Sequence, residues 1–176
     1  MMNMEASFHT YRDIALKTTV LQLPFTGSYS MLLMMPDVME TLENGISPDH
    51  VSKWLKVRME AKPRRQNLYI PKFSIKSSYN LNNVLSEMGM TDMFSGRANL
   101  RGISEVKGLA VSEVVHQATL DMDEDGAEAA AGTGLKLELT SIQVPVLKFN
   151  CPFMVIIIEF NTEKILFMGK IIDPTI

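Results

Sequence analysis

The first half of the chain contains a clear hairpin pattern. Between Thr18 and Met35 the residues are mainly β-branched, aromatic or aliphatic, and Thr26-Gly27-Ser28 interrupts them. Such a run with a central turn sequence predicts two antiparallel strands joined by a tight turn.

Two segments show helical spacing instead. Ser47-Pro48 offers an N-cap followed by proline at the first helical position, and Val51, Trp54, Leu55 and Arg58 fall on one face, which predicts a helix of about three turns. From Asn80 to Met88 apolar residues again recur at helical spacing, and Gly89 is placed to end a short helix as a C-cap.

The remaining apolar segments predict strands. Leu68 to Ile75 alternates in polarity, and its central Pro71 favours an edge strand. Further strands are predicted at 109–122, 144–150, 153–160 and 165–172, with a polar turn at 161–164 between the last two. The predicted fold class is therefore α+β, with antiparallel strands toward the C-terminal end.

A small-residue segment from Ala127 to Thr140 also alternates. One set of alternate positions is nearly all apolar and the interleaved set is polar or small, as a half-buried strand requires. Alanine, glycine and threonine bury little area, so ordering this segment depends on the sheet that receives it. The pattern predicts either the second arm of a long hairpin after Asp125-Gly126 or a conditional strand.

Composition narrows the function classes. The chain has 176 residues, 46% of them hydrophobic, which is enough for one domain with a core. A net charge of -3 argues against a chain-wide nucleic-acid surface. The single cysteine, Cys151, cannot form an internal disulfide, and the apolar run from Phe153 to Ile158 is too short to span a membrane.

No catalytic constellation is visible. His9, His50 and His116 lie in unrelated segments, and no nucleophile-and-base motif accompanies them. We therefore expect neither an enzyme nor a cofactor or metal site. The first residues, Met1 to Glu5, do not start a signal peptide.

Several motifs in a fixed order resemble one family. They are Glu124-Asp125-Gly126-Ala127-Glu128-Ala129-Ala130-Ala131-Gly132, Val115-His116-Gln117-Ala118, Phe149-Asn150-Cys151-Pro152-Phe153, Leu166-Phe167-Met168-Gly169-Lys170 with Asp173-Pro174, Leu33-Met34-Met35-Pro36-Asp37, Ile70-Pro71-Lys72-Phe73 and Leu85-Ser86-Glu87-Met88-Gly89. The first is similar to the hinge of the serpins. The whole chain resembles the C-terminal half of a secreted, antitrypsin-like (clade A) serpin, with the N-terminal half absent.

The resemblance implies a serine protease inhibitor rather than an enzyme. The reactive-centre loop would span about residues 124–144, and its hinge would comprise Glu124, Gly126, Ala127, Glu128, Ala129, Ala130 and Ala131. A serine protease would attack the loop, form an acyl-enzyme and be trapped as the cleaved loop inserts into a sheet.

Family spacing places the reactive bond at Thr140-Ser141, with a threonine that suits an elastase-like protease. A shift of one residue would present Leu139 to a chymotrypsin-like enzyme. His116 has two interpretations: a satisfied core histidine, or, by resemblance, a member of a hydrogen-bonded cluster that controls opening of the sheet.

Basic residues are concentrated in one segment. They are Lys53, Lys56, Arg58, Lys62, Arg64 and Arg65, with Glu60 the one acid among them. They form either a solvated face or, as in some antitrypsin-like serpins, a heparin site that binds a linear polyanion.

Other serpin roles stay open. Gly134 to Ser141 also resembles the loop of corticosteroid-binding globulin, a non-inhibitory hormone carrier. The tryptophan of that carrier's steroid site would fall near Glu163, in the Thr162-Glu163-Lys164 turn, where this chain has no aromatic residue. An interaction role, or an inactive fragment, is a further alternative. The family implies a secreted, extracellular protein.

Overall fold

The structure is a computed structural model that describes residues 1–60, 62–123 and 144–173 of the chain. The chain divides into two compact units, Met1–Phe73 together with Met122–Ile176, and Ser74–Asp121.

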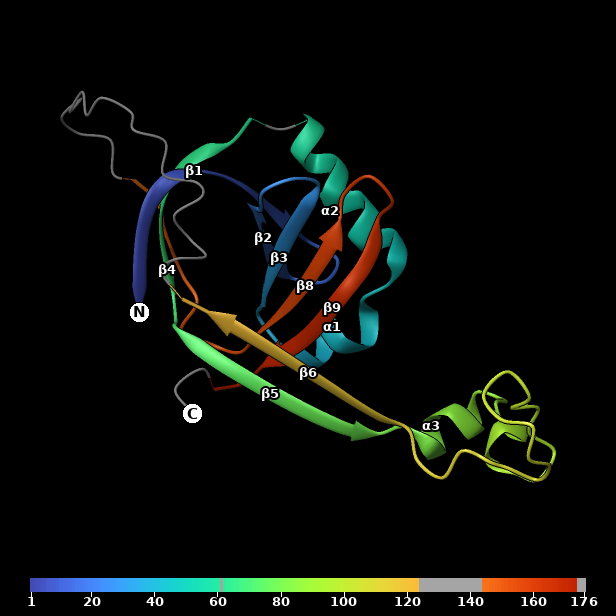
Figure 1. Ribbon diagram of the computed structural model, residues 1–176. Coiled ribbons are helices and arrows are strands. Elements are labelled where there is room, and N and C mark those ends of the chain that lie inside the picture. Colours follow the sequence, from blue (N-terminus) through green and yellow to red (C-terminus); the bar gives the residue numbers. More distant parts are fainter. Residues whose placement is uncertain (61, 124–143, 174–176) are drawn as a thin grey trace. The chain divides into compact units, whose positions relative to one another are not determined.

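The larger unit is built on a seven-stranded sheet in the order β7-β4-β1-β2-β3-β8-β9 (Figure 1). Its elements are β1 (Met2–Asp13), β2 (Thr18–Pro24), β3 (Tyr29–Pro36), α1 (Met39–Gly45), α2 (Pro48–Glu60), β4 (Arg64–Ile70), β7 (Val146–Lys148), β8 (Phe153–Glu159) and β9 (Lys164–Ile171). Neighbouring strands are antiparallel except β4 and β7, which are parallel.

Strand β1 joins the two parts of this sheet. Residues 2–8 of β1 pair with β4, and residues 9–13 pair with β2. The same strand therefore changes its partner at Phe8 and His9, and its two ends lie in different parts of the sheet.

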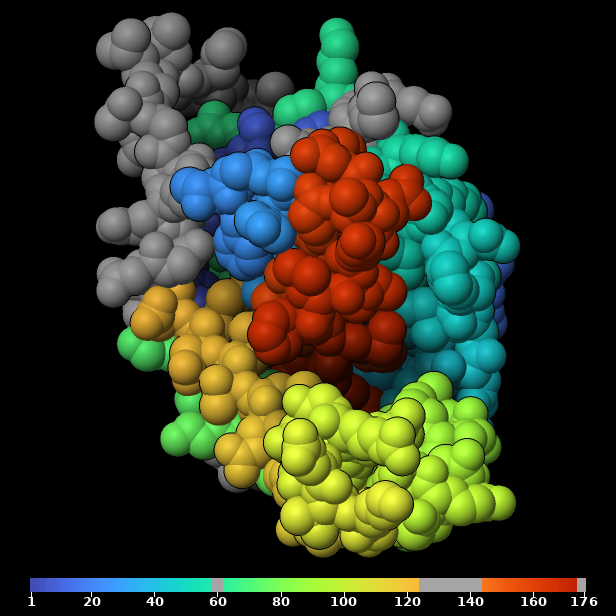
Figure 2. Space-filling view, turned by 45° about the vertical axis from the view of Figure 1, so that its right-hand side comes forward, coloured from blue at the N-terminus to red at the C-terminus, as the bar shows by residue number. Residues whose placement is uncertain are grey.

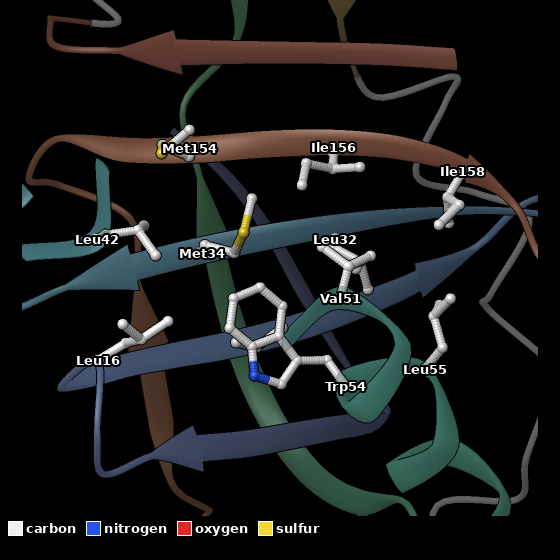
Figure 3. Packing of buried hydrophobic residues seen from close by; sticks show 11 residues of the cluster. Leu16, Leu32, Met34, Leu42, Val51, Trp54, Leu55, Met154, Ile156 and Ile158 are labelled. Atoms are coloured by element: carbon white, nitrogen blue, oxygen red, sulfur yellow. The ribbon is translucent and has the colours of Figure 1, made fainter. Parts of the chain in front are cut away.

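Helix α2 covers one face of the sheet. Val51, Trp54 and Leu55 lie at helical spacing and are all buried, and Trp54 packs toward Leu32 and Met34 of β3 (Figure 3). Helix α1 adds the fully buried Leu42 to the same cluster. Figure 2 shows the red surface of the β8–β9 hairpin beside the cyan surface of the two helices.

The opposite face of the sheet carries a second set of buried residues. Because side chains alternate along a strand, Phe8, Leu21 and Leu33 point away from α2, and each is at most 2% exposed. Phe149 and Phe153 are fully buried, with ring centroids 5.2 Å apart in an edge-on arrangement. Burial of each such side chain stabilises the fold by about 1.5 to 3 kcal/mol.

A buried carboxylate links the sheet to α2. Asp13, the last residue of β1, is 0% exposed. One oxygen accepts a hydrogen bond from the Leu16 backbone N–H at 3.1 Å, and the other accepts one from Trp54 Nε1 at 3.0 Å. Lys53 Nζ lies 3.5 Å from the second oxygen. Burial raises the pKa of Asp13, whereas the hydrogen bonds and the Lys53 charge together lower it by more, so the net shift of the pKa is downward.

The smaller unit contains a two-stranded sheet of β5 (Phe73–Asn80) and β6 (Val115–Met122). Between them lie α3 (Asn82–Glu87) and the 3₁₀ turn η1 (Asp92–Phe94). Asn82, the first residue of α3, binds the segment that leads into β6. Its Nδ2 donates to the Ser112 carbonyl at 2.9 Å, and its Oδ1 accepts from the Val114 N–H at 2.9 Å. Figure 1 shows β5 and β6 running in opposite directions.

Several predicted elements are confirmed. The β2–β3 hairpin, helix α2, helix α3 and the β8–β9 hairpin lie where the patterns place them. Gly89 has a φ of 95°, a conformation that glycine adopts without strain at the end of a helix.

Other expectations were wrong. The predicted edge strand at 68–75 is two strands, because β4 ends at Ile70 and β5 begins at Phe73. Pro71 has no backbone N–H to donate to a ladder, so the sheet pairing ends there. Strand β4 is also internal, lying between β1 and β7. The predicted strand at 109–122 begins only at Val115.

We predict that Asp13→Ala destabilises the chain by about 3 to 5 kcal/mol, because the N–H groups of Trp54 and Leu16 lose their buried acceptor. Asp37→Ala is the matched control. Asp37 pairs with Arg12 at 2.6 Å but is 54% exposed, so its loss should cost less than about 1 kcal/mol. Urea unfolding followed by circular dichroism measures both variants.

The same contact predicts loss of stability in acid. The pKa of Asp13 is lower in the folded chain than the ordinary value of 3.8. The ionised carboxylate therefore adds to the free energy of unfolding above that pH, and this stabilisation is lost as the pH falls through the folded pKa. Equal destabilisation by the two variants at pH 7 would contradict this role of Asp13.

Candidate functional site: the strands before and after residues 124–143

The predicted reactive segment lies outside the described residues. This applies to the hinge residues Glu124, Gly126, Ala127, Glu128, Ala129, Ala130 and Ala131, and to Leu139, Thr140 and Ser141. Their roles stay predictions. The structure describes the strands that precede and follow them, β6 and β7.

Strand β6 ends shortly before the predicted hinge in the sequence. Among the described residues β6 pairs with β5 alone, so its other edge presents unpaired backbone N–H and C=O groups. Most of its side chains are exposed, whereas Met122 at its end is 8% exposed. An open strand edge is a place where a further strand can pair.

Strand β7 holds the chain after residue 143. Its three residues pair in parallel with β4, and backbone bonds flank them on both sides. The Asn67 N–H donates to the Pro145 carbonyl at 2.9 Å, and the Phe149 N–H donates to the Tyr69 carbonyl at 2.9 Å. With Phe149 fully buried next, this end of the segment is fixed to the larger unit.

His116 lies on β6 with an exposed side chain. Within the described residues His116 is therefore not a buried core histidine. Its membership of a cluster that controls sheet opening stays a prediction.

The basic residues do not form one surface. Lys53 is 3.5 Å from Asp13, and its ammonium lies 5.3 Å from the centre of the Tyr11 ring. A hydrogen bond with Tyr11 and the charge of Asp13 raise the pKa of Lys53. Arg65 pairs with Glu5 at 2.7 Å.

The other basic residues are less engaged. Lys56, Lys62 and Arg64 are exposed and form no ion pair within the described residues. Arg64 and Arg65 are consecutive in β4, so their side chains point to opposite faces of the sheet. The side chain of Arg58 is outside the described part. The sequence cluster is thus split between two faces.

The turn between β8 and β9 is fixed by carboxylates. Hydrogen bonds from Thr162 and Ser28 lower the pKa of Glu159 to about 2. Glu163, where the carrier resemblance would require an aromatic residue, instead accepts a hydrogen bond from Ser52 of α2 at 2.5 Å. This turn is therefore bound to the helix by polar contacts.

Residues 1–60, 62–123 and 144–173 contain neither a metal-binding cluster nor a membrane-spanning helix. No group of three or more His, Cys, Asp or Glu side chains there could hold a metal ion. No helix in the same ranges is long and apolar enough to cross a membrane.

Comparison with known proteins decides the family. The model of the serpin (serine protease inhibitor) family matches residues 1–174. The chain belongs to the serpin family. Serpins are generally protease inhibitors and not enzymes.

The relatives place this serpin in the predicted group. The chain is 39% identical to Serpin A3-1 of Bos taurus over 178 residues, covering 99% of this chain and 42% of the relative. It is 40% identical to human alpha-1-antichymotrypsin over 169 residues, covering 93% of this chain and 40% of the relative. The resemblance to an antitrypsin-like, clade A serpin is confirmed.

Solved structures support the same fold. Thyroxine-binding globulin in complex with thyroxine matches with a TM-score of 0.82 and 31% identity, covering 99% of this chain and 46% of that one. Human glycosylated kallistatin matches with a TM-score of 0.79 and 34% identity, covering 98% and 46%. The α+β serpin fold is therefore confirmed, and the chain spans less than half the length of these relatives.

Proposed function

We propose that this serpin chain carries the bait loop of a serine protease inhibitor that acts as a suicide substrate. The observation that carries the proposal is the set of small residues Ala127, Ala129, Ala130 and Ala131, in a chain of a family whose members generally inhibit proteases. Its similarity to alpha-1-antichymotrypsin adds support.

The proposed reaction begins at the loop. The serine hydroxyl of the protease attacks the carbonyl carbon of Thr140, the bond to Ser141 breaks, and the amine of Ser141 leaves with the proton. The protease then remains joined to Thr140 as an ester. Deacylation by water would release it, so inhibition requires that the loop moves first.

The movement is the addition of a strand. The segment from Glu124 follows β6 by one residue, and β6 has an open edge in the described part of the chain. Residues 127–140 alternate between an apolar and a polar or small set, as a strand with one buried face does. Small side chains at the hinge allow this strand to enter without steric conflict. The protease attached at Thr140 would be carried with it.

The bond sets the expected targets. A threonine on the acyl side suits the small pocket of an elastase-like protease, and cleavage after Leu139 would suit a chymotrypsin-like enzyme. We also propose that the protein is secreted, since a relative from Tamias sibiricus, 43% identical over 169 residues, is named a plasma protein.

A hormone carrier is the second candidate, favoured by the similarity to thyroxine-binding globulin. Two features weigh against a hormone site between α2 and the sheet. Glu163 accepts a hydrogen bond from Ser52 of α2, and the hollow between α2 and the sheet beside Gln22 and Trp54 measures about 10 Å³. A hollow of that size holds about one water molecule, whereas ligand pockets measure about 300 to 1,000 Å³.

The inhibitor proposal predicts a complex that survives SDS. Incubation of the chain with pancreatic elastase or chymotrypsin should give a band of their summed mass on a denaturing gel. Ala127→Arg should reduce the complex about tenfold or more while cleavage continues, because a charge on the apolar set would be buried without a partner on insertion.

Glu128→Arg provides the matched control. It introduces the same side chain one residue later, in the polar set, and should leave the complex intact. Mass spectrometry should show that the released C-terminal peptide begins at Ser141. Complete cleavage of the unmodified chain without any SDS-stable complex would reject inhibition and favour the carrier or an inactive fragment.

A sulfated polysaccharide such as heparin is a proposed additional partner, through the exposed Lys56 and Lys62. Lys56→Ala with Lys62→Ala should lower the salt concentration that elutes the chain from heparin by a clear step, since each cation adds to the electrostatic attraction. Glu5→Gln, which frees Arg65 from its ion pair, should raise it. If the double variant and Glu5→Gln both elute at the same salt concentration as the unmodified chain, these basic residues form a solvated face and not a heparin site.

A further inference from the structure

A hollow opens where the large sheet divides. Strand β1 leaves β4 after Phe8 and pairs with β2 from His9 onward. Between the diverging strands lies a hollow of about 230 Å³, lined by residues of β1, β2 and β4 and by the start of β7. Its lining includes Thr10 and Arg12, which point away from α2, and also Tyr11, which packs against the α2 cluster.

One side of the hollow offers an unused acceptor. Gln66 Nε2 donates a hydrogen bond to Thr10 Oγ1 at 2.8 Å, which fixes the orientation of the amide. Its Oε1 atom is buried and has no hydrogen-bond partner within the described residues. A buried acceptor without a partner costs free energy, so a ligand that donates a hydrogen to Gln66 would recover it.

The same hollow contains one unengaged cation. Arg12 pairs with Asp37 at 2.6 Å and donates to Thr19 Oγ1 at 3.2 Å. Arg64 also lines the hollow, is exposed, and forms no ion pair in the described ranges. Its guanidinium can bind a carboxylate through two parallel N–H groups.

We propose that this hollow binds an acidic peptide segment of a partner protein. A glutamate or aspartate carboxylate pairs with Arg64, a peptide N–H donates to Gln66 Oε1, and an aliphatic side chain contacts Leu147, which the register with Leu68 places on the Gln66 face. A fully ionised sulfate group has no hydrogen to donate to Gln66 and no apolar part for Leu147. The assignment does not depend on whether the chain inhibits a protease.

The test is a titration of the ¹⁵N-labelled full chain at low salt, followed by NMR. The probe is the blocked peptide acetyl-Glu-Glu-Leu-amide, and its matched control is acetyl-Gln-Gln-Leu-amide. The acidic peptide should shift the Gln66 side-chain amide and the Arg64 Nε signals, and the neutral peptide should bind about tenfold more weakly.

Variants locate the contact. Arg64→Ala should weaken the acidic peptide about tenfold, and Arg64→Lys should weaken it less, because the charge stays while the paired donors are lost. Gln66→Leu should also weaken binding. Lys56→Ala, which removes an exposed cation of α2, should leave it unchanged. Unaltered amide spectra away from the hollow show that each variant folds.

Three results would overturn the proposal. The first is equal binding of the two peptides. The second is an equal loss of affinity for the acidic peptide in Arg64→Ala and Lys56→Ala. The third is a chemical-shift change of the Gln66 and Arg64 signals with a heparin oligosaccharide but not with the acidic peptide. The last result would assign the hollow to a polyanion.

Discussion

The Asp13 carboxylate is the contact on which the larger unit depends. It lies at the end of β1, the strand that pairs with β4 at one end and β2 at the other. From that position it accepts hydrogen bonds from the turn that starts β2 and from Trp54, the aromatic centre of the α2 face. Sheet and helix are therefore fixed to each other by one buried charge, which Lys53 balances from the solvent side.

The elements with a strong local pattern were predictable from sequence. The β2–β3 hairpin has a turn between two apolar runs, and α2 follows Ser47-Pro48 and has regular apolar spacing. Strand β1 was missed because Asn3, Glu5 and Ser7 interrupt a short set of apolar residues. Its alternation of Met2, Met4, Ala6 and Phe8 was the available signal, but pairing with β4, about 60 residues away, is what makes it a strand.

Sequence motifs predicted the family, but they did not predict which side chains of the candidate site lie together. The hinge sequence identified the family, which the comparisons confirm, but the grouping of basic residues depended on strand register. Consecutive Arg64 and Arg65 point to opposite faces, and the partner of Lys53 lies 40 residues away in sequence. The hollow beside Gln66 arises where β1 changes partner, and no local pattern indicates such a point.

Strand addition is a consequence of sheet geometry in the proposed function. A strand edge is a set of unpaired hydrogen-bonding groups, and within the described residues β6 presents one shortly before the predicted hinge in the sequence. The alternation of residues 127–140 makes that segment suitable for this edge, while its small side chains keep the uninserted state accessible. In the proposed reaction, cleavage before Ser141 separates the inserting segment from β7, so β7 and the buried Phe149 can stay in place.

Hydrogen exchange of the β6 amides tests this account most directly. Amide exchange at residues 115–122 would be measured before and after complete cleavage of the Thr140-Ser141 bond. Insertion predicts that alternate β6 amides, those facing the open edge, become at least about tenfold more protected as they gain ladder partners. Unchanged exchange at these amides in the fully cleaved chain would contradict it.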